Sequence, residues 1–286
     1  MPPRILVSPA DMRVASDGWR RDGRRISFVP TMGYLHAGHV ALLDEARRHG
    51  DIAVLSIFVN PTQFGPKEDL ARYPRDLDGD LAKAAGAGID YAFVPTAEAM
   101  YPAGYQTYVD VRALSSGLCG ASRPGHFTGV ATVVAKLFGL VQPHVAFFGR
   151  KDFQQLRVIE RMTADLHLGV EVVGCPIVRE PDGLAMSSRN AYLSPDDRAQ
   201  APALQAALRL AADAHRDGER SVEALLARAT QHLATTPFQL DYLELRRRDD
   251  LTLFAVTVDG PAVLALAAFI GPPTRRTRLI DNLELG

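Results

Sequence analysis

The chain has 286 residues, of which 47% are apolar and 23% charged, with a formal net charge of −1. These values exclude the disordered, collagen-like and disulfide-scaffold classes and are typical of globular proteins. Although Arg accounts for 28 of the 32 basic residues, 33 acidic residues offset them. A protein that binds a nucleic-acid duplex normally has a surplus of basic residues, and this chain has none. An anionic ligand would therefore have to be bound by a local group of hydrogen-bond donors.

The cysteines and the N-terminal sequence indicate in which cellular compartment the protein is expected. Cys119 and Cys175 lie far apart with no CxxC spacing, which indicates two buried apolar residues rather than a zinc cage or a disulfide. No apolar run approaches the roughly 18 residues of a membrane span, and the N-terminus lacks the pattern of a signal peptide. We therefore expect a cytoplasmic protein with no membrane partner.

Short apolar runs alternate with helical patterns through the first two thirds of the chain. The predicted strands are Arg25 to Pro30, Ile52 to Asn60, Ile89 to Pro95, Val145 to Gly149 and Val170 to Val178. The predicted helices between them are Val40 to His49, Asp76 to Ala87, Gly129 to Val141 and Phe153 to Leu168. Continuous apolar strands separated by helices predict an α/β protein with a Rossmann-like, doubly wound parallel sheet.

The pattern changes after about Val178. Helices are predicted over Pro195 to Arg216 and Ser221 to Thr235, followed by strands over Gln239 to Leu245, Ala262 to Ile270 and Leu279 to Leu285. We expect two domains: a catalytic domain over residues 1–180 and a smaller C-terminal α+β domain over residues 181–286.

The first candidate loop runs from Phe28 to His39, where a strand ends and a helix begins. Free backbone N–H groups at a helix N-terminus favour an anion, and His36 and His39 add two donors there. The alternatives are an ordinary loop with two surface histidines, and a zinc site, for which no third ligand is suggested nearby.

Two further loops follow predicted strands. Asn60 and Gln63 lie beyond the strand that ends near Phe58, where open α/β sheets bind ligands, although a polar turn would look the same. Lys151 follows Gly149 at the start of another helix, as a phosphate contact or as a solvated charge.

The last two candidate segments also carry cationic and hydroxyl groups. Arg179 to Asn190 contains a Pro-Asp-Gly turn followed by two serines and an arginine, a set that can hold phosphate oxygens or form an ordinary hinge. Arg123 to Gly129 opens another helix. Each loop alone is weak evidence for a ligand site. All of them, however, lie after strands or at helix starts, on the ligand-binding side of the predicted sheet.

Together these segments resemble the pantothenate synthetase family, within the HxGH nucleotidyltransferases. The matching motifs are PTMGxLHxGH at Pro30 to His39, FVNPxQFG at Phe58 to Gly65, YPR at Tyr73 to Arg75, RPGHFxGVATVVxKLF at Arg123 to Phe138, GxKDxQQ at Gly149 to Gln155, and REPDGLAMSSRNxYLS at Arg179 to Ser194. The similarity covers about residues 25–195 in register and continues weakly to Arg278 to Asn282.

The resemblance implies ATP-dependent ligation of pantoate to β-alanine through pantoyl adenylate, with release of pyrophosphate and AMP. It implies catalytic roles for His39 (the proton donor), His36, Lys151, Ser187, Ser188 and Arg189. It implies ATP contacts from Met32, Gly33, Tyr34, Leu35, His36, Ala37, Gly38, His39, Gly149, Arg150, Lys151, Asp152, Val178, Met186, Ser187, Ser188 and Arg189. Gln63, Gln155 and Asn60 are implied to bind pantoate and β-alanine.

Other implications are magnesium with the nucleotide, a homodimer, no nucleic-acid partner, and a small domain acting as a lid that excludes water. No spacing fixes the magnesium ligands; Asp80 and Asp152 are candidates. The sequence departs from the family at Arg150, where an acidic residue is usual, and at Phe153, where tyrosine is usual. We expect Arg150 to face solvent, with a phosphate contact as the alternative.

Two other functions are compatible with the same residues. One is transfer of AMP to a different acceptor, such as a phosphorylated cofactor precursor, which would yield a stable adenylylated product instead of free AMP. The other is non-catalytic binding of a nucleotide or of RNA, which would give ligand binding without turnover.

Overall fold

The computed structural model describes residues 1–66 and 68–286, which form two compact units. The first contains Met1–Ser115, Arg123–Arg150 and Val158–Pro176, and the second contains Ser116–Ser122, Lys151–Arg157 and Ile177–Gly286. In the ranges described, no helix combines the length and apolar character needed to cross a membrane.

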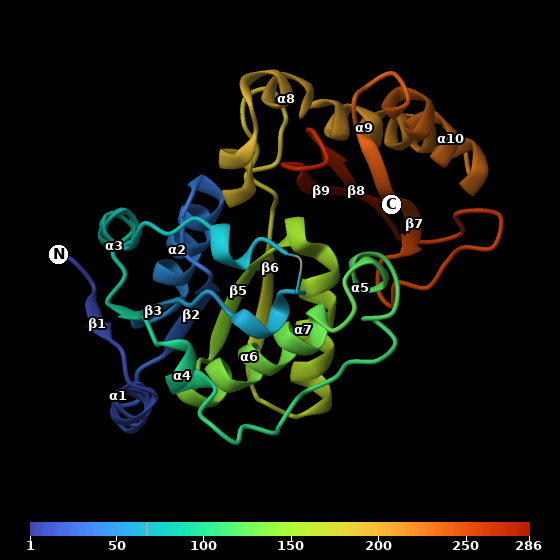
Figure 1. Ribbon diagram of the computed structural model, residues 1–286. Coiled ribbons are helices and arrows are strands. Elements are labelled where there is room, and N and C mark those ends of the chain that lie inside the picture. Colours follow the sequence, from blue (N-terminus) through green and yellow to red (C-terminus); the bar gives the residue numbers. More distant parts are fainter. Residues whose placement is uncertain (67) are drawn as a thin grey trace. The chain divides into compact units, whose positions relative to one another are not determined.

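A six-stranded parallel sheet forms the centre of the first unit (Figure 1). Its strands are β1 (Arg4–Leu6), β2 (Ile26–Thr31), β3 (Ile52–Ile57), β4 (Tyr91–Phe93), β5 (Val145–Gly149) and β6 (Glu171–Cys175), in the spatial order β1-β4-β3-β2-β5-β6. The chain moves outward from β2 to β4 and then returns to the other side of β2. This reversal lies between β2 and β5, and open α/β sheets bind ligands beyond the carboxyl ends of their strands at such a point.

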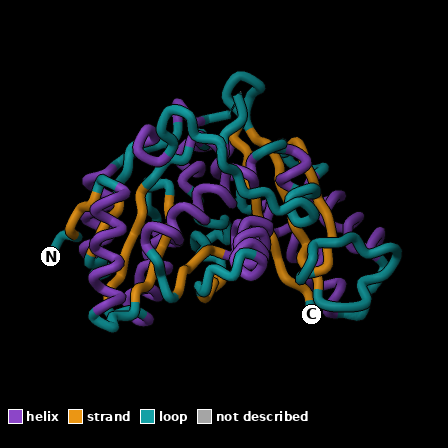
Figure 2. Tube along the Cα trace, turned by 90° about the horizontal axis from the view of Figure 1, so that it is seen from below, coloured by secondary structure: helices purple, strands orange, loops and turns teal. Residues whose placement is uncertain are grey.

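Helices cover both faces of this sheet (Figure 2). Because successive strand residues point to opposite faces, neighbours on β2 pack against different helices. Phe28 contacts Phe138 of α6 (His126–Val141), whereas Val29 joins the buried cluster that includes Leu43 of α2 (Ala37–His49). The other helices before residue 166 are α1 (Pro9–Arg21), α3 (Leu77–Gly86), α4 (Ala97–Met100), α5 (Cys119–Ser122) and α7 (Phe153–Asp165).

An antiparallel sheet with helices forms the second unit. Its strands, in spatial order, are β7 (Gln239–Arg247), β8 (Ala262–Ile270) and β9 (Thr277–Leu285), and its helices are α8 (Pro195–Gln200), α9 (Ala203–Arg216) and α10 (Val222–Leu233). Apolar residues of α9 and α10 pack with those of β8 and β9 in one core. The predicted α/β class with a smaller α+β domain is confirmed.

Several elements differ from the sequence prediction, among them the short helices α4 and α5, which were not predicted. The strand β1 and the helix α1 were not predicted, and the helix predicted over Pro195 to Arg216 is wrong as a single element. It is two helices, α8 and α9, because Pro202 lies between them and cannot donate a backbone hydrogen bond. Cys119 and Cys175 are both buried, as predicted.

The helix α6 approaches the short 3-10 turn η1 (Pro61–Gln63) with backbone against backbone. A Cβ added at Gly129 would lie 2.4 Å from the Thr62 carbonyl oxygen and 2.7 Å from the Gln63 Cα, so this contact requires glycine. Gly139, near the other end of the same helix, has no atom within 4 Å of such a Cβ.

These two glycines give a matched test of the packing. Gly139→Ala should stabilise the protein by about 0.5–1 kcal/mol, because alanine has the higher helix propensity. Gly129→Ala should destabilise it by about 1–3 kcal/mol, because the new methyl group forces η1 away from α6. Urea unfolding of both variants measures the difference, and equal effects of the two substitutions would contradict the close contact.

Candidate active site

The loop between β2 and α2 is held by the carboxylate of Asp80. This residue of α3 is 1% exposed, and its Oδ2 accepts a hydrogen bond from the Tyr34 backbone N–H at 2.8 Å. Its Oδ1 accepts one from the Leu35 N–H at 2.6 Å. The backbone turns sharply here, with φ of 83° at Gly33 and 50° at Tyr34. The two bonds therefore stabilise a conformation that a non-glycine residue at position 34 adopts at a cost.

Gly33 and Asp80 are also in close contact. A Cβ on Gly33 would lie 2.9 Å from Asp80 Oδ2, so the loop needs glycine for this approach as well as for its positive φ. Burial raises the pKa of the Asp80 carboxyl above its usual value, although the N–H groups of Leu35 and Tyr34 act in the opposite direction. Asp80 is thus a structural acceptor for this loop.

His36 and His39 form the start of α2. His36 is the N-cap, and its Nδ1 accepts a hydrogen bond from the Gly38 N–H at 3.1 Å. His39 Nδ1 accepts one from the His36 N–H at 3.3 Å, and the two ring centroids are 4.0 Å apart. Because both Nδ1 atoms accept, a neutral ring carries its proton on Nε2. Each imidazole can therefore donate through Nε2 at a helix N-terminus, where an anion is favoured.

Asn60 and Gln63 lie at η1, after β3. Both are buried, with exposed fractions of 1% and 8%. Asn60 Nδ2 donates to Gln63 Oε1 at 3.0 Å, and Gln63 Nε2 lies 3.3 Å from the Met32 sulfur. The first and second candidate loops therefore meet, and a neutral amide donor lies beside the loop that precedes the histidines.

Gly149 ends β5, and Arg150 follows it as the last residue of this segment of the first unit. Arg150 is exposed, as expected, and its Nε donates to the Gly174 carbonyl oxygen at 3.1 Å. The buried ring of Phe153, at the start of α7, occupies the position where tyrosine is usual.

The segment around Lys151 belongs to the second unit. The carbonyl oxygen of Lys151 accepts a hydrogen bond from Asn282 Nδ2 at 2.8 Å, which attaches the segment to β9. Gln154 Oε1 accepts from the Cys119 N–H at 3.0 Å, so this amide positions the neighbouring loop. Gln155 is partly exposed and Asp152 is exposed.

The segment from Val178 to Arg189 begins with a tight hairpin that ends at Met186. The Met186 N–H donates to the Val178 carbonyl at 3.0 Å. Arg179 forms a bidentate pair with the nearly buried carboxylate of Asp281, at 2.6 and 2.9 Å. The Ser187 side chain accepts from the Arg189 N–H at 3.2 Å, and the short 3-10 helix η4 (Ser188–Tyr192) begins there.

The structure therefore places the predicted site residues in two groups. Those in the first unit are Met32 to His39, Asn60, Gln63, Gly149 and Arg150; those in the second are Lys151, Asp152, Gln155, Val178 and Met186 to Arg189. Within the first unit, the loops containing Met32 and Gln63 are brought into contact. Within the second, Val178 and Met186 are paired, and Lys151 is anchored separately through Asn282.

Within residues 1–66 and 68–286, no group of three or more His, Cys, Asp or Glu residues could hold a metal ion. Asp80 is one of the two magnesium candidates, and both of its carboxylate oxygens accept backbone hydrogen bonds from the loop.

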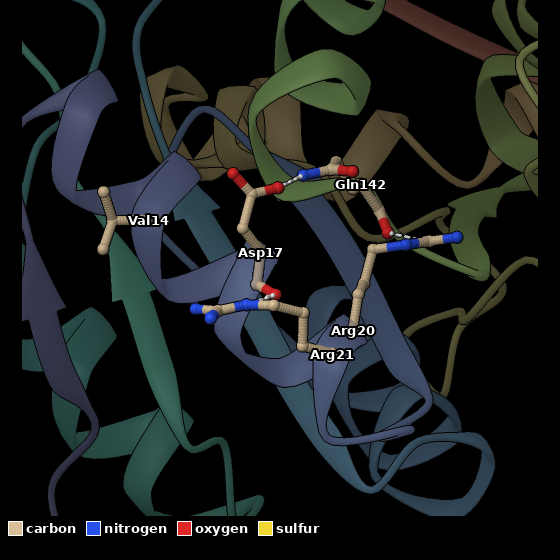
Figure 3. Close-up of a pocket in the computed structure, with 5 residues that line it drawn as sticks. All are labelled: Val14, Asp17, Arg20, Arg21 and Gln142. Carbon is tan, nitrogen blue, oxygen red and sulfur yellow. Dashed lines mark hydrogen bonds between the residues drawn. The ribbon is translucent and has the colours of Figure 1, made fainter.

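A surface hollow of about 600 Å³ lies on α1 and the end of α6 (Figure 3). Its polar side chains bond to their neighbours: Gln142 Nε2 to Asp17 at 2.5 Å and Arg20 to the Gln142 carbonyl at 2.7 Å. None of the predicted site residues lines it.

Comparison with known proteins decides the family. The model of the family described as pantoate-beta-alanine ligase matches residues 4–284. The chain belongs to this family. The pantothenate synthetase of Myxococcus xanthus is 54% identical, with 100% of this chain and 97% of that protein covered.

Solved structures of the family agree with the fold. The pantothenate synthetase of Thermus thermophilus is 47% identical, with a TM-score of 0.90 and 98% of each chain covered. The pantoate-beta-alanine ligase of Francisella tularensis is 30% identical, with a TM-score of 0.80 and 98% and 97% coverage. That structure is described as complexed with beta-gamma ATP and beta-alanine.

The sequence analysis did not predict the contacts that two residues, Asp80 and Tyr101, make with the first group. Asp80 was considered only for magnesium, because its partner Leu35 lies 45 positions earlier in the chain. Tyr101, whose hydroxyl donates to Asn60 Oδ1 at 2.8 Å, gave no sequence signal, because Asn60 lies 41 positions earlier in the chain.

Asp80→Ala tests whether this carboxylate holds the loop. We expect a loss of about 3 kcal/mol in stability, because two N–H groups lose their acceptor, together with weaker ATP binding. Asp80→Asn, which keeps one oxygen, should lose less. Asp78→Ala is the control: it is exposed in the first turn of the same helix and should cost less than about 1 kcal/mol. Thermal unfolding with and without ATP measures both quantities, and equal behaviour of Asp80→Ala and Asp78→Ala would refute the role.

Proposed function

We infer that this chain condenses pantoate with β-alanine to form pantothenate at the expense of ATP. The geometry that supports this best is the histidine pair at the N-terminus of α2, beside the loop that reaches the buried Gln63 amide. This arrangement offers donors for phosphate oxygens next to a neutral donor for an organic acid.

We propose that the reaction proceeds in two steps. A carboxylate oxygen of pantoate bonds to the α-phosphorus of ATP while the bond to the bridging oxygen of the β-phosphate breaks, and pyrophosphate leaves. The amine of β-alanine then attacks the acyl carbon of pantoyl adenylate, loses a proton, and displaces AMP. Correct orientation of the acid toward phosphorus can supply up to about 7–11 kcal/mol of barrier reduction.

The first step brings anions together, so it needs preorganised donors around the phosphates. His36 and His39 supply Nε2 donors, and His39 protonates the departing pyrophosphate. Met32 to His39, Gly149 and the backbone of Arg150 contact ATP from the first unit.

The second unit supplies the remaining donors. Lys151, Ser187, Ser188 and Arg189 donate to phosphate oxygens, while Asp152, Val178 and Met186 contact the nucleotide. The domain over residues 181–286 acts as the lid that keeps water from the adenylate.

Asn60, Gln63 and Gln155 bind the acid and amine substrates. Neutral amides suit the hydroxyls and carboxylate of pantoate, because they hold an anion without retaining the product through a full charge. Gln63 also lies near β-alanine.

Magnesium is proposed to accompany ATP. This ion keeps several waters and uses substrate phosphates as ligands, so one or two carboxylates suffice. The exposed carboxylate of Asp152 fits that requirement, whereas Asp80 is occupied by backbone N–H groups. We also propose a homodimer in the cytoplasm.

Substitution of His39 tests the acid role. His39→Gln should reduce turnover about 10²–10⁴-fold, the usual loss when a positioned acid is removed. Gln can still accept the His36 N–H as the third residue of a capping box, so the helix start is retained. His49→Gln, on an exposed site in the same helix, should keep normal turnover.

The assay measures AMP and pantothenate released from ATP, pantoate and β-alanine. Near-normal turnover of His39→Gln would refute the role of His39. A stable adenylylated product without AMP, from the unsubstituted protein, would refute the proposed function and favour a different acceptor.

A further inference from the structure

We propose that Tyr101 is a positioning residue for pantoate. Its hydroxyl holds the Asn60 amide, and Asn60 in turn donates a hydrogen bond to the carboxamide oxygen of Gln63. The NH2 group of Gln63 is then the donor to the acid. This inference rests on the proposed function. It assigns a direction to the Gln63 amide and a role to a residue that follows α4, outside the motifs of the family resemblance.

The orientation of the Asn60 amide is fixed by backbone groups. Its Nδ2 lies 3.1 Å from the Gly129 carbonyl oxygen, which can only accept. Its Oδ1 accepts from the Thr62 backbone N–H at 3.4 Å, which can only donate. The reverse orientation would place donor against donor and acceptor against acceptor, so it is excluded at this buried site.

The orientation of the Gln63 amide follows. Asn60 Nδ2 donates its second hydrogen to Gln63 Oε1 at 3.0 Å, so this oxygen is already occupied. Gln63 Nε2 is then the group that can donate to a ligand. Its described contact is the Met32 sulfur at 3.3 Å, a weak acceptor that a carboxylate or hydroxyl oxygen of pantoate can replace with a gain in energy.

Tyr101 completes the chain of bonds. Its hydroxyl donates to Asn60 Oδ1 at 2.8 Å, and the Thr62 hydroxyl donates to the same atom at 2.9 Å. Burial raises the pKa of Tyr101 to about 12, so the hydroxyl keeps its proton at physiological pH and acts as a constant donor.

The ring of Tyr101 is held from other directions. Lys136 of α6 places its Nζ 5.3 Å from the Tyr101 centroid and 4.3 Å from that of Tyr105. The Tyr101 and Tyr105 rings meet edge to face at 5.1 Å. These contacts do not involve the hydroxyl, so removal of that group should leave the ring in place.

The backbone of Gln63 has its own supports. Its carbonyl oxygen accepts from Arg123 Nη2 at 3.2 Å and lies 2.8 Å from His126 Nδ1. Loss of the Tyr101 hydroxyl therefore changes the restraint on the side-chain amide and leaves the position of η1 unchanged.

Tyr101→Phe tests the proposal by a split between kinetic constants. Loss of one orienting hydrogen bond should raise the KM for pantoate about 3- to 10-fold, while the KM for ATP changes less than about twofold. Tyr108→Phe is the control, because Tyr108 is 57% exposed and its ring contacts Tyr105 instead. Equal KM values for pantoate in Tyr101→Phe and in the unsubstituted protein would overturn the proposal.

A double-substitution cycle separates positioning from a general structural effect. If Tyr101 acts through the Gln63 amide, Tyr101→Phe should have no further effect on the pantoate KM in a Gln63→Ala background. Additive effects in the two backgrounds would overturn the proposal even if the single variant is impaired. Thr62→Val, which removes the second hydroxyl on Asn60 Oδ1, gives the same comparison if Tyr101→Phe does not fold.

The unsubstituted protein distinguishes the two levels of failure. If the unsubstituted protein forms pantothenate and Tyr101→Phe has unchanged kinetics, the proposed function stands and only the role of Tyr101 is refuted. Absence of both turnover and pantoate binding in the unsubstituted protein would overturn both.

Discussion

The buried carboxylate of Asp80 is the constraint on which the first group of site residues depends. The parallel sheet brings the loop after β2 to its carboxyl edge, where the backbone N–H groups of Tyr34 and Leu35 donate to a side chain instead of to a backbone carbonyl. Asp80 accepts both, at 2.8 and 2.6 Å, and the chain then enters α2 with His36 as its cap. Because the cap bonds occupy both Nδ1 atoms, the same local geometry that starts the helix presents the Nε2 donors. The loop conformation and the proposed acid chemistry therefore have one structural origin.

The amide groups of Asn60 and Gln63 are also oriented by the local backbone. The Gly129 carbonyl and the Thr62 N–H each have one possible hydrogen-bond role, and they fix the direction of the Asn60 amide between them. The Asn60 amide then orients the Gln63 amide through one hydrogen bond. The absence of a side chain at Gly129 is what lets α6 come close enough to take part. Packing and the proposed binding of pantoate are thus linked at one glycine.

Much of the fold and part of the site could be predicted from the sequence. The bounds of β5 and β8 were predicted as observed, because both are continuous apolar runs with clear ends. The strand β1 was missed because it has only three residues, none of them buried. Among the proposed site residues, His36, His39 and Gln63 lie in local motifs, so the sequence alone was enough to propose them. The contact between Asp80 and Leu35 spans 45 positions, and that between Tyr101 and Asn60 spans 41, so only the folded chain brings these groups together.

The central claim is that the donors at the carboxyl edge of the sheet serve the adenylation of an acid. Exchange of labelled pyrophosphate into ATP, measured with pantoate and without β-alanine, tests it most directly, because it reports the first step alone. We predict exchange that depends on pantoate, since the acid must be activated before the amine is needed. A folded protein that binds ATP but shows no pantoate-dependent exchange would contradict the account.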